Sequence, residues 1–162
     1  MIPIVSIVGR SNTGKTTLIE KLIPELKGRG YRVATIKHNV HGFDIDHKGK
    51  DSWRHRAAGA QATLIASPHS VALIEDVDRD FELEELRDRY IDNVDIILSE
   101  GFKKNSLPKI EIVRSELKHE PLCVKEDNLI AVASDQLQER GVPCLDINDV
   151  KGLADLIEER FL

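Results

Sequence analysis

A glycine-rich segment near the N-terminus carries the clearest chemical pattern in this sequence. Residues 9–17 read Gly-Arg-Ser-Asn-Thr-Gly-Lys-Thr-Thr and fit the pattern G-x-x-x-x-G-K-[ST] without a mismatch. In such a loop, successive backbone N–H groups and the positive end of the following helix surround phosphate oxygens. We expect Lys15 to reach the terminal phosphates and the Thr16 hydroxyl to bind Mg²⁺. The predicted nucleotide-binding residues of the loop are Gly9, Asn12, Thr13, Gly14, Lys15, Thr16 and Thr17.

A phosphate loop needs an acidic group to complete the Mg²⁺ shell, usually at the end of a neighbouring apolar strand. Two residues compete for this role, Asp95 at the start of the run Val94–Ser99 and Glu100 at its end. The loop lies at the carboxyl end of the sheet, so the geometry favours Glu100. We therefore predict Glu100 as a metal-shell residue together with Thr16, and as a candidate catalytic carboxylate. Asp95 is expected to cap backbone groups at its end of the sheet or to face solvent.

A long polar stretch from His38 to Asp51 follows the second predicted strand and is expected to open toward the phosphates. Its carboxylates are candidates to hold the Mg²⁺ shell or to orient a water, and Asp46 is the second candidate catalytic residue. Its basic residues Lys48 and Lys50, with Arg54 just beyond, are candidates to neutralise phosphate charge. The alternative is a solvated loop with no such role.

Four histidines, His38, His41, His47 and His55, lie in or just after the same stretch. Imidazole binds Zn²⁺ and Ni²⁺, which raises the possibility of a transition-metal site. The spacings match no standard zinc signature, and no C-x-x-C accompanies them. Histidines beside phosphates can also serve as charge-assisted donors.

Recognition of a nucleobase is the least defined part of the pattern. The nearest match to the guanine-reading motif [NT]-K-x-D is Val124–Asp127, but it precedes a strand instead of following one. Asp135 stands after the apolar run Leu129–Ser134, where a carboxylate could accept the two N–H donors of guanine. The equal alternative is that Asp135 caps a short helix over residues 135–141.

The elements around these residues predict an α/β fold. A β-branched run over residues 2–8 precedes the loop, a helix is expected from Lys15 to Gly28, and Tyr31–Lys37 reads as the next strand. Strand, helix and strand in this order predict a parallel pair with a right-handed crossover. Ala62–Ala66 and Val71–Glu75 read as a β-hairpin that lies at a sheet edge or projects toward a partner. The prediction is a P-loop NTPase three-layer sandwich, with a mostly parallel sheet and an edge β-hairpin.

The composition limits the classes of protein to consider. The chain has 162 residues and a formal net charge of −5, which suit one domain over residues 1–162 and argue against nucleic acid as a partner. No apolar run approaches the ~20 residues that a membrane helix needs, so no membrane association is expected. The N-terminus enters a strand without a signal segment, which predicts a cytoplasmic protein.

The chain resembles the MobB family of molybdopterin-guanine dinucleotide biosynthesis proteins. The resemblance spans residues 4–135. It is carried, in order, by the phosphate loop, Thr35–His38 with His41, Asp46 with Gly49–Ser52, Arg54 and His55, Ala58–Ala60, Ser99–Lys103, Pro108–Glu111 and Ala133–Asp135. The combination of Gly49–Ser52 with Glu100–Lys103 is far more specific for this family than the phosphate loop, which alone indicates only a superfamily.

The resemblance implies a GTP-binding accessory protein with weak Mg²⁺-dependent GTPase activity, which assists the conversion of molybdopterin to its guanine dinucleotide. It also implies partnership with a MobA-like molybdopterin guanylyltransferase and a homodimer formed through extended β-structure, for which the hairpin at 62–75 is the expected place. The preference for guanine rests on the resemblance alone. Two alternatives are a P-loop small-molecule kinase and a nickel- or zinc-insertion GTPase that uses the histidine-bearing loop.

Overall fold

The computed structural model describes residues 1–39, 41–102, 105–117 and 120–162. Val40 of the polar loop and Lys103 of the Ser99–Lys103 block lie outside these residues. The elements in chain order are β1 (Ile4–Val8), α1 (Lys15–Gly28), β2 (Val33–Lys37), α2 (Asp51–Ala57), β3 (Ala62–Ala66), β4 (Val71–Glu75), α3 (Leu83–Tyr90), β5 (Ile96–Glu100), β6 (Lys109–Val113), η1 (Ser115–Leu117), η2 (Lys125–Asp127), β7 (Leu129–Ser134), β8 (Cys144–Asp146) and α4 (Val150–Phe161).

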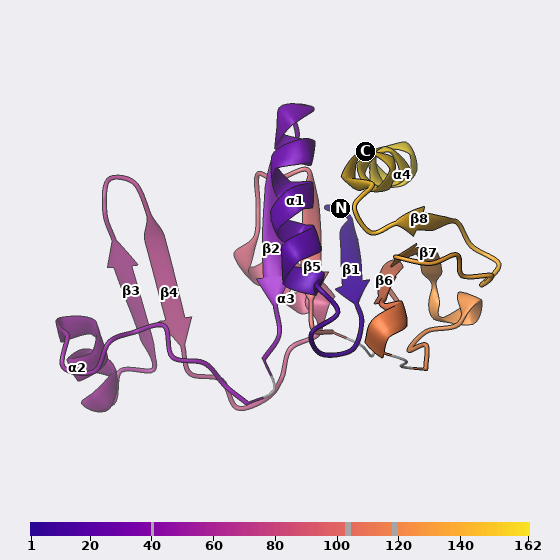
Figure 1. Ribbon diagram of the computed structural model, residues 1–162. Helices are drawn as coiled ribbons and strands as arrows, with labels where there is room; N and C mark the ends of the chain where they lie inside the picture. Colours follow the sequence, from indigo (N-terminus) through magenta and orange to yellow (C-terminus); the bar gives the residue numbers. More distant parts are fainter. Residues whose placement is uncertain (40, 103–104, 118–119) are drawn as a thin grey trace. The chain divides into compact units, whose positions relative to one another are not determined.

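The described residues form two compact units, residues 1–38 with 82–162 and residues 39–81. The first unit contains a six-stranded sheet in the order β2-β5-β1-β6-β7-β8, and every neighbouring pair is parallel (Figure 1). Strand β1 lies inside the sheet, between β5 and β6. Its carboxyl end leads directly into the loop at residues 9–14. Ligands of open parallel sheets bind at this edge.

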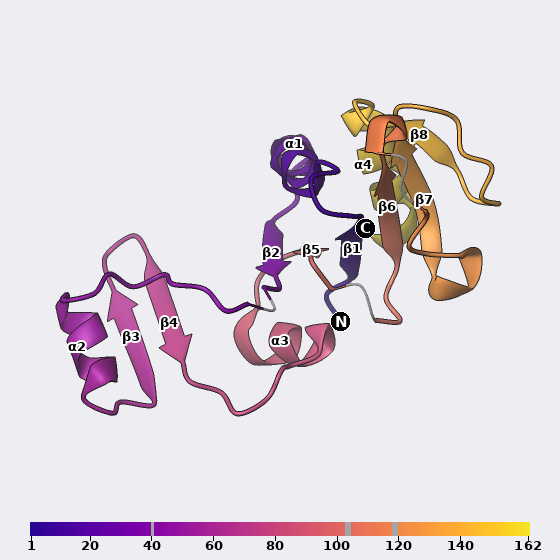
Figure 2. The same cartoon turned by 60° about the horizontal axis from the view of Figure 1, so that its bottom comes forward.

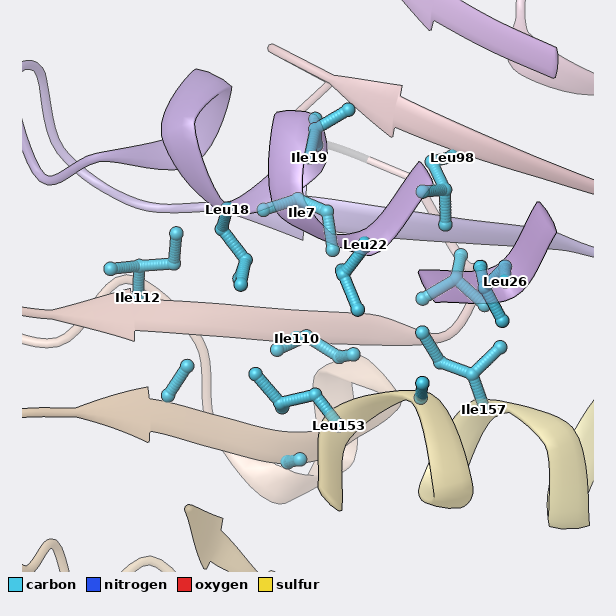
Figure 3. Packing of buried hydrophobic residues seen from close by; sticks show 14 of the residues in the cluster. Ile7, Leu18, Ile19, Leu22, Leu26, Leu98, Ile110, Ile112, Leu153 and Ile157 are labelled. Carbon is cyan, nitrogen blue, oxygen red and sulfur yellow. The ribbon is translucent and has the colours of Figure 1, made fainter. Parts of the chain in front are cut away.

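Helices cover both faces of this sheet, which gives the three predicted layers (Figure 2). On one face, the apolar stripe of α1 and that of α4 pack on inward-pointing residues of the strands (Figure 3). The labelled side chains Leu22 and Leu26 of α1 and Ile157 of α4 are completely buried there. On the other face, Leu83 of α3 packs with Ile97 of β5. Strands buried on both faces are apolar almost throughout, which explains why β1, β5 and β7 are readable as continuous hydrophobic runs.

The second unit holds α2 and the hairpin β3–β4. The hairpin is confirmed, with Leu64 opposite Leu73 and Thr63 opposite Ile74. It forms an antiparallel sheet of its own, and among the described residues neither strand is paired with the six-stranded sheet. The single domain that we expect over residues 1–162 stays a prediction.

The predicted helix over residues 135–141 is wrong, because none of these residues is helical. The carboxylate expected to cap this helix, that of Asp135, instead accepts the N–H of Ser115 at 2.9 Å. The N–H of Gln136 donates to Ser134 Oγ at 3.2 Å, and the N–H of Gln138 to Cys144 Sγ at 3.4 Å. Helix α3 begins at Leu83, after a capping box in which the N–H of Glu82 donates to the Glu85 carboxylate at 2.9 Å. No helix among the described residues is long and apolar enough to cross a membrane.

Candidate phosphate and metal site

The loop between β1 and α1 is shaped by its glycines and by one buried threonine. Gly14 stands at the N-cap of α1 with φ 97°, a left-handed conformation that favours glycine. At Gly9, a Cβ would lie 2.7 Å from Thr13 Oγ1 and 3.0 Å from the Ile112 carbonyl, so a side chain there would collide with the fold. The buried Thr13 hydroxyl donates to the Arg10 carbonyl at 2.9 Å and closes the loop.

Lys15 lies across this loop. Its ammonium donates to the carbonyls of Gly9 at 3.1 Å and Arg10 at 2.8 Å. The first turn of α1 contains no acidic residue that would offset the positive end of the helix. A lysine ammonium beside the start of a helix whose first turn has no acidic residue is an arrangement suited to a phosphate anion.

Thr16 and Glu100 are brought together by the pairing of β1 with β5. The Thr16 hydroxyl donates to the Glu100 carboxylate, 3.0 Å from Oε1 and 3.1 Å from Oε2. Glu100 ends β5 opposite Ile7 of β1 and Lys37 of β2. Lys37 Nζ lies 3.6 Å from Glu100 Oε1, a pairing that we had not predicted. A hydroxyl and a carboxylate are the hard oxygen donors that Mg²⁺ prefers, so this pair fits the ion.

Asp95 lies at the opposite end of β5, as expected. Its carboxylate accepts the backbone N–H of Arg32 at 2.7 Å and pairs with the Arg32 guanidinium at 3.2 Å. These bonds lower the pKa of Asp95 below its ordinary value. Asp95 therefore caps the start of β2.

Asp135 stands at the carboxyl end of β7, but its carboxylate is engaged. It accepts the Ser115 N–H at 2.9 Å and the Ser115 hydroxyl at 3.0 Å. The Ser115 N–H is the main cause of a lowered pKa of Asp135. Because no helix follows it, the helix-cap alternative is wrong, and Asp135 instead binds the start of η1. Its role in reading guanine stays a prediction.

Arg114 is a residue beside the loop that our sequence reasoning missed. It follows β6, and its Nε donates to the Thr13 carbonyl at 3.3 Å. Its guanidinium comes within 3.5 Å of where a Cβ on Gly14 would stand. The only sequence signal was a basic residue after an apolar strand. That signal becomes informative once β6 is known to be the neighbour of β1.

Asp46 and three of the four histidines fall in the second unit. Asp46 accepts a hydrogen bond from the Ser52 hydroxyl at 2.8 Å, and its catalytic role stays a prediction. His38 belongs to the first unit, where its ring packs on Phe102 with centroids 4.5 Å apart. Within residues 1–39, 41–102, 105–117 and 120–162, no group of three His, Cys, Asp or Glu side chains is placed to hold a metal ion.

Comparison with known proteins identifies the family to which the chain belongs. The model of the family "MobB: Molybdopterin guanine dinucleotide synthesis protein B" matches residues 4–135, from β1 through Asp135. The chain belongs to the MobB family. The match includes the loop, Thr16, Glu100 and Asp46, so the predicted site residues lie inside the MobB region.

Individual MobB relatives agree with this assignment over nearly the whole chain. The Escherichia coli molybdopterin-guanine dinucleotide biosynthesis adapter protein is 44% identical over 98% of this chain and 93% of its own. The Haemophilus influenzae adapter protein of the same name is 39% identical over 97% of this chain and 88% of its own. The crystal structure of Bacillus subtilis MobB superimposes with a TM-score of 0.79 at 30% identity and covers 99% of both chains. The fold prediction is therefore confirmed.

Proposed function

We propose that this chain binds GTP with Mg²⁺ at the loop of residues 9–17 and acts as an adapter in the conversion of molybdopterin to molybdopterin guanine dinucleotide. The observation that carries the proposal is the contact of Thr16 with Glu100 beside an intact G-x-x-x-x-G-K-[ST] loop. The MobB relatives with adapter names supply the pathway.

Each site residue has a distinct task in this proposal. The N–H groups at the start of α1 bind phosphate oxygens, and Lys15 moves from the loop carbonyls to the terminal phosphates. Thr16 and Glu100 would hold Mg²⁺, which when bound would neutralise charge on the phosphates. Glu100 ends β5 and lies 3.6 Å from Lys37 Nζ, so the fold fixes its carboxylate beside Thr16, where it would hold the ion. The expected activity is a slow GTPase.

The proposed partners are a MobA-like molybdopterin guanylyltransferase and a second copy of this chain, in the cytoplasm. The hairpin supports the homodimer. Leu64 and Leu73 face each other across it and remain 63% and 45% exposed, whereas the pair Thr63 and Ile74 on the other face is 9% and 8% exposed. An apolar strand face that stays open in one copy is suited to burial against another.

Calorimetry with GTP and Mg²⁺ tests the nucleotide site. Lys15→Ala should abolish GTP binding and leave the circular dichroism spectrum unchanged, because the Lys15 ammonium donates to carbonyls of the loop, outside the core. Lys21→Ala is the matched control, since Lys21 lies on the same helix and contacts Asn148. Equal GTP affinity in Lys15→Ala and the wild type would reject the site.

Copurification tests the adapter role. The tagged full-length chain, used as bait in an extract of its source cells, should retain a molybdopterin nucleotidyltransferase. Retention should weaken or strengthen when GTP and Mg²⁺ are added, if the nucleotide controls docking. A bait that never enriches this enzyme, with or without GTP, would contradict the proposed partnership.

A further inference from the structure

The corner at which β5 ends contains a close backbone contact that the proposed function does not explain. Glu100 is the last residue of β5, and Gly101 follows it with φ 100°. A Cβ on Gly101 would lie 2.6 Å from the carbonyl oxygen of His38 and 3.4 Å from its carbonyl carbon. Atoms at the shorter distance would overlap. Only glycine therefore allows these two segments of backbone to lie against each other.

A second glycine separates this contact from the backbone conformation that accompanies it. Gly30, which follows α1, has φ 98°, nearly the same as Gly101. Nothing lies within 4 Å of the position that a Cβ on Gly30 would take. Gly30 thus serves only the turn, whereas Gly101 also makes room for the His38 carbonyl. An alanine at either position has a similar conformational cost, but only the alanine at 101 collides with a neighbour.

His38 contacts three consecutive residues of this corner. Its N–H donates to the Glu100 carbonyl at 2.9 Å, and its own carbonyl lies against Gly101. Its ring packs on the ring of Phe102, with centroids 4.5 Å apart and planes inclined by 33°. Phe102 is only 8% exposed and belongs to a core cluster that includes Leu83. Both the backbone and the ring of His38 therefore join the end of β5 to the core.

These contacts fix the backbone from which the Glu100 side chain extends. Lys37 and Glu100 are the last pair in the register of β2 with β5, and the His38 N–H adds a bond beyond that pair. The end of a strand opens more readily than its middle, because fewer contacts hold it. The Glu100 carboxylate is 14% exposed and accepts the Thr16 hydroxyl at 3.0 Å. A shift of the backbone at Glu100 would separate these two groups.

We propose that His38 is a positioning residue for Glu100, and that Gly101 is required because the His38 carbonyl occupies the space of a side chain. His38 holds the end of β5 so that the Glu100 carboxylate stays against Thr16, where Mg²⁺ would bind. The ring of His38 acts as a packing surface on Phe102, and its nitrogens have no chemical task. The role of Glu100 toward Mg²⁺ rests on the proposed function, whereas the contact of His38 with Gly101 does not.

The first experiment compares Gly101→Ala with Gly30→Ala in the full-length protein, without nucleotide or Mg²⁺. Hydrogen exchange followed by NMR measures the opening of the His38 N–H. The carbon-13 signal of the Glu100 carboxylate reports its contact with Thr16, and Thr16→Val supplies the signal of a carboxylate that has lost this contact. Gly101→Ala should accelerate the exchange of the His38 N–H about tenfold or more and move the Glu100 signal toward that of Thr16→Val. Gly30→Ala should change neither.

The second experiment separates packing from imidazole chemistry. His38→Phe keeps a ring on Phe102, whereas His38→Ala removes it, and both keep the backbone N–H. The Glu100 signal should move in His38→Ala and stay in His38→Phe. The Mg²⁺ concentration for half-maximal GTP hydrolysis should rise about tenfold in His38→Ala, because groups that orient a metal ligand change metal affinity by about this factor. It should stay at the wild-type value in His38→Phe. A loss of global stability alone would lower the amount of active protein without moving this concentration.

Wild-type exchange of His38 and an unmoved Glu100 signal in Gly101→Ala would overturn the proposal. Equal changes in Gly101→Ala and Gly30→Ala would also overturn it, because the strained φ would then be the cause. An equal loss in His38→Phe and His38→Ala would assign a chemical task to the imidazole and reject a role in packing. If Gly101→Ala does not fold, the two His38 variants decide.

The two proposals fail separately. A wild-type protein without Mg²⁺-dependent GTP hydrolysis would reject the proposed function. The NMR comparison uses neither nucleotide nor metal, so it still decides whether His38 positions Glu100. Normal hydrolysis in the wild type, with a Glu100 signal that moves in none of the His38 and Gly101 variants, would reject the positioning role alone.

Discussion

The Thr16 hydroxyl donates to both carboxylate oxygens of Glu100, at 3.0 and 3.1 Å, although 84 positions separate the two residues in the sequence. Parallel pairing of β1 with β5 places Glu100 opposite Ile7, just before the loop begins. A hydroxyl and a carboxylate, whose oxygens can both bind a metal ion, thus meet at the carboxyl edge of the sheet. This contact is the basis for the first prediction.

Glu100→Gln should lower the rate of Mg²⁺-dependent GTP hydrolysis by about tenfold or more, because it removes one charged group from the proposed metal site. GTP affinity should change by only about a few-fold, because the lysine and backbone groups of the loop are unchanged. Hydrolysis is measured at several Mg²⁺ concentrations, and affinity by calorimetry. Asp95→Asn is the control, since Asp95 lies at the other end of β5 and contacts Arg32. Hydrolysis at the wild-type rate in Glu100→Gln would remove Glu100 from the metal site.

Arg114→Ala should weaken GTP binding about tenfold, because it removes a guanidinium that donates to the Thr13 carbonyl beside the proposed phosphate site. Calorimetry at two salt concentrations checks this, and the loss should shrink as salt increases. Arg160→Ala, an exposed arginine in the last turn of α4, is the control for net charge. If Arg114→Ala and Arg160→Ala both bind GTP with the affinity of the wild type, Arg114 does not contribute to nucleotide binding.

Leu64→Glu should convert the proposed homodimer to a monomer, because it places a charge on the open face of the hairpin opposite Leu73. Light scattering coupled to size-exclusion chromatography gives the mass. Leu137→Glu is the control, since Leu137 is 79% exposed and lies outside the hairpin. A wild-type protein that is monomeric throughout, or a Leu64→Glu protein that stays dimeric, would contradict the hairpin interface.

Cys123 should make stability depend on alkaline pH. Burial, followed by the nearby charge of Glu111, raises the pKa of the Cys123 thiol from 9.0 to about 11. The folded state therefore favours the neutral thiol, and this contribution is complete below 9.0 and is lost as the pH rises through about 11. Urea unfolding from about pH 8 to about pH 11 should show a steeper decline for the wild type than for Cys123→Ala. Cys144→Ala should keep the wild-type slope if Cys123 is the cause.

Much of the fold is readable from the sequence because its signals are local. The boundaries of α1 and β7 and the existence of the hairpin follow from apolar spacing and turn residues. The failed helix at 135–141 shows the limit of this reasoning. Its expected cap, Asp135, binds both the N–H and the hydroxyl of Ser115 on a distant segment. Contacts between remote residues overrode a local preference.

The sequence by itself determined the glycine-rich loop of this MobB protein, because Gly14, with its left-handed φ, and Lys15 lie next to each other and Thr13 is close enough in sequence to contact Gly9. It also favoured Glu100 over Asp95, because the direction of a parallel strand decides which end faces the loop. Only the tertiary structure decided that Arg114 lies beside Thr13 and that His38 lies against Gly101. Strand order and side-chain packing join residues far apart in the chain, and no local spacing encodes which of them meet.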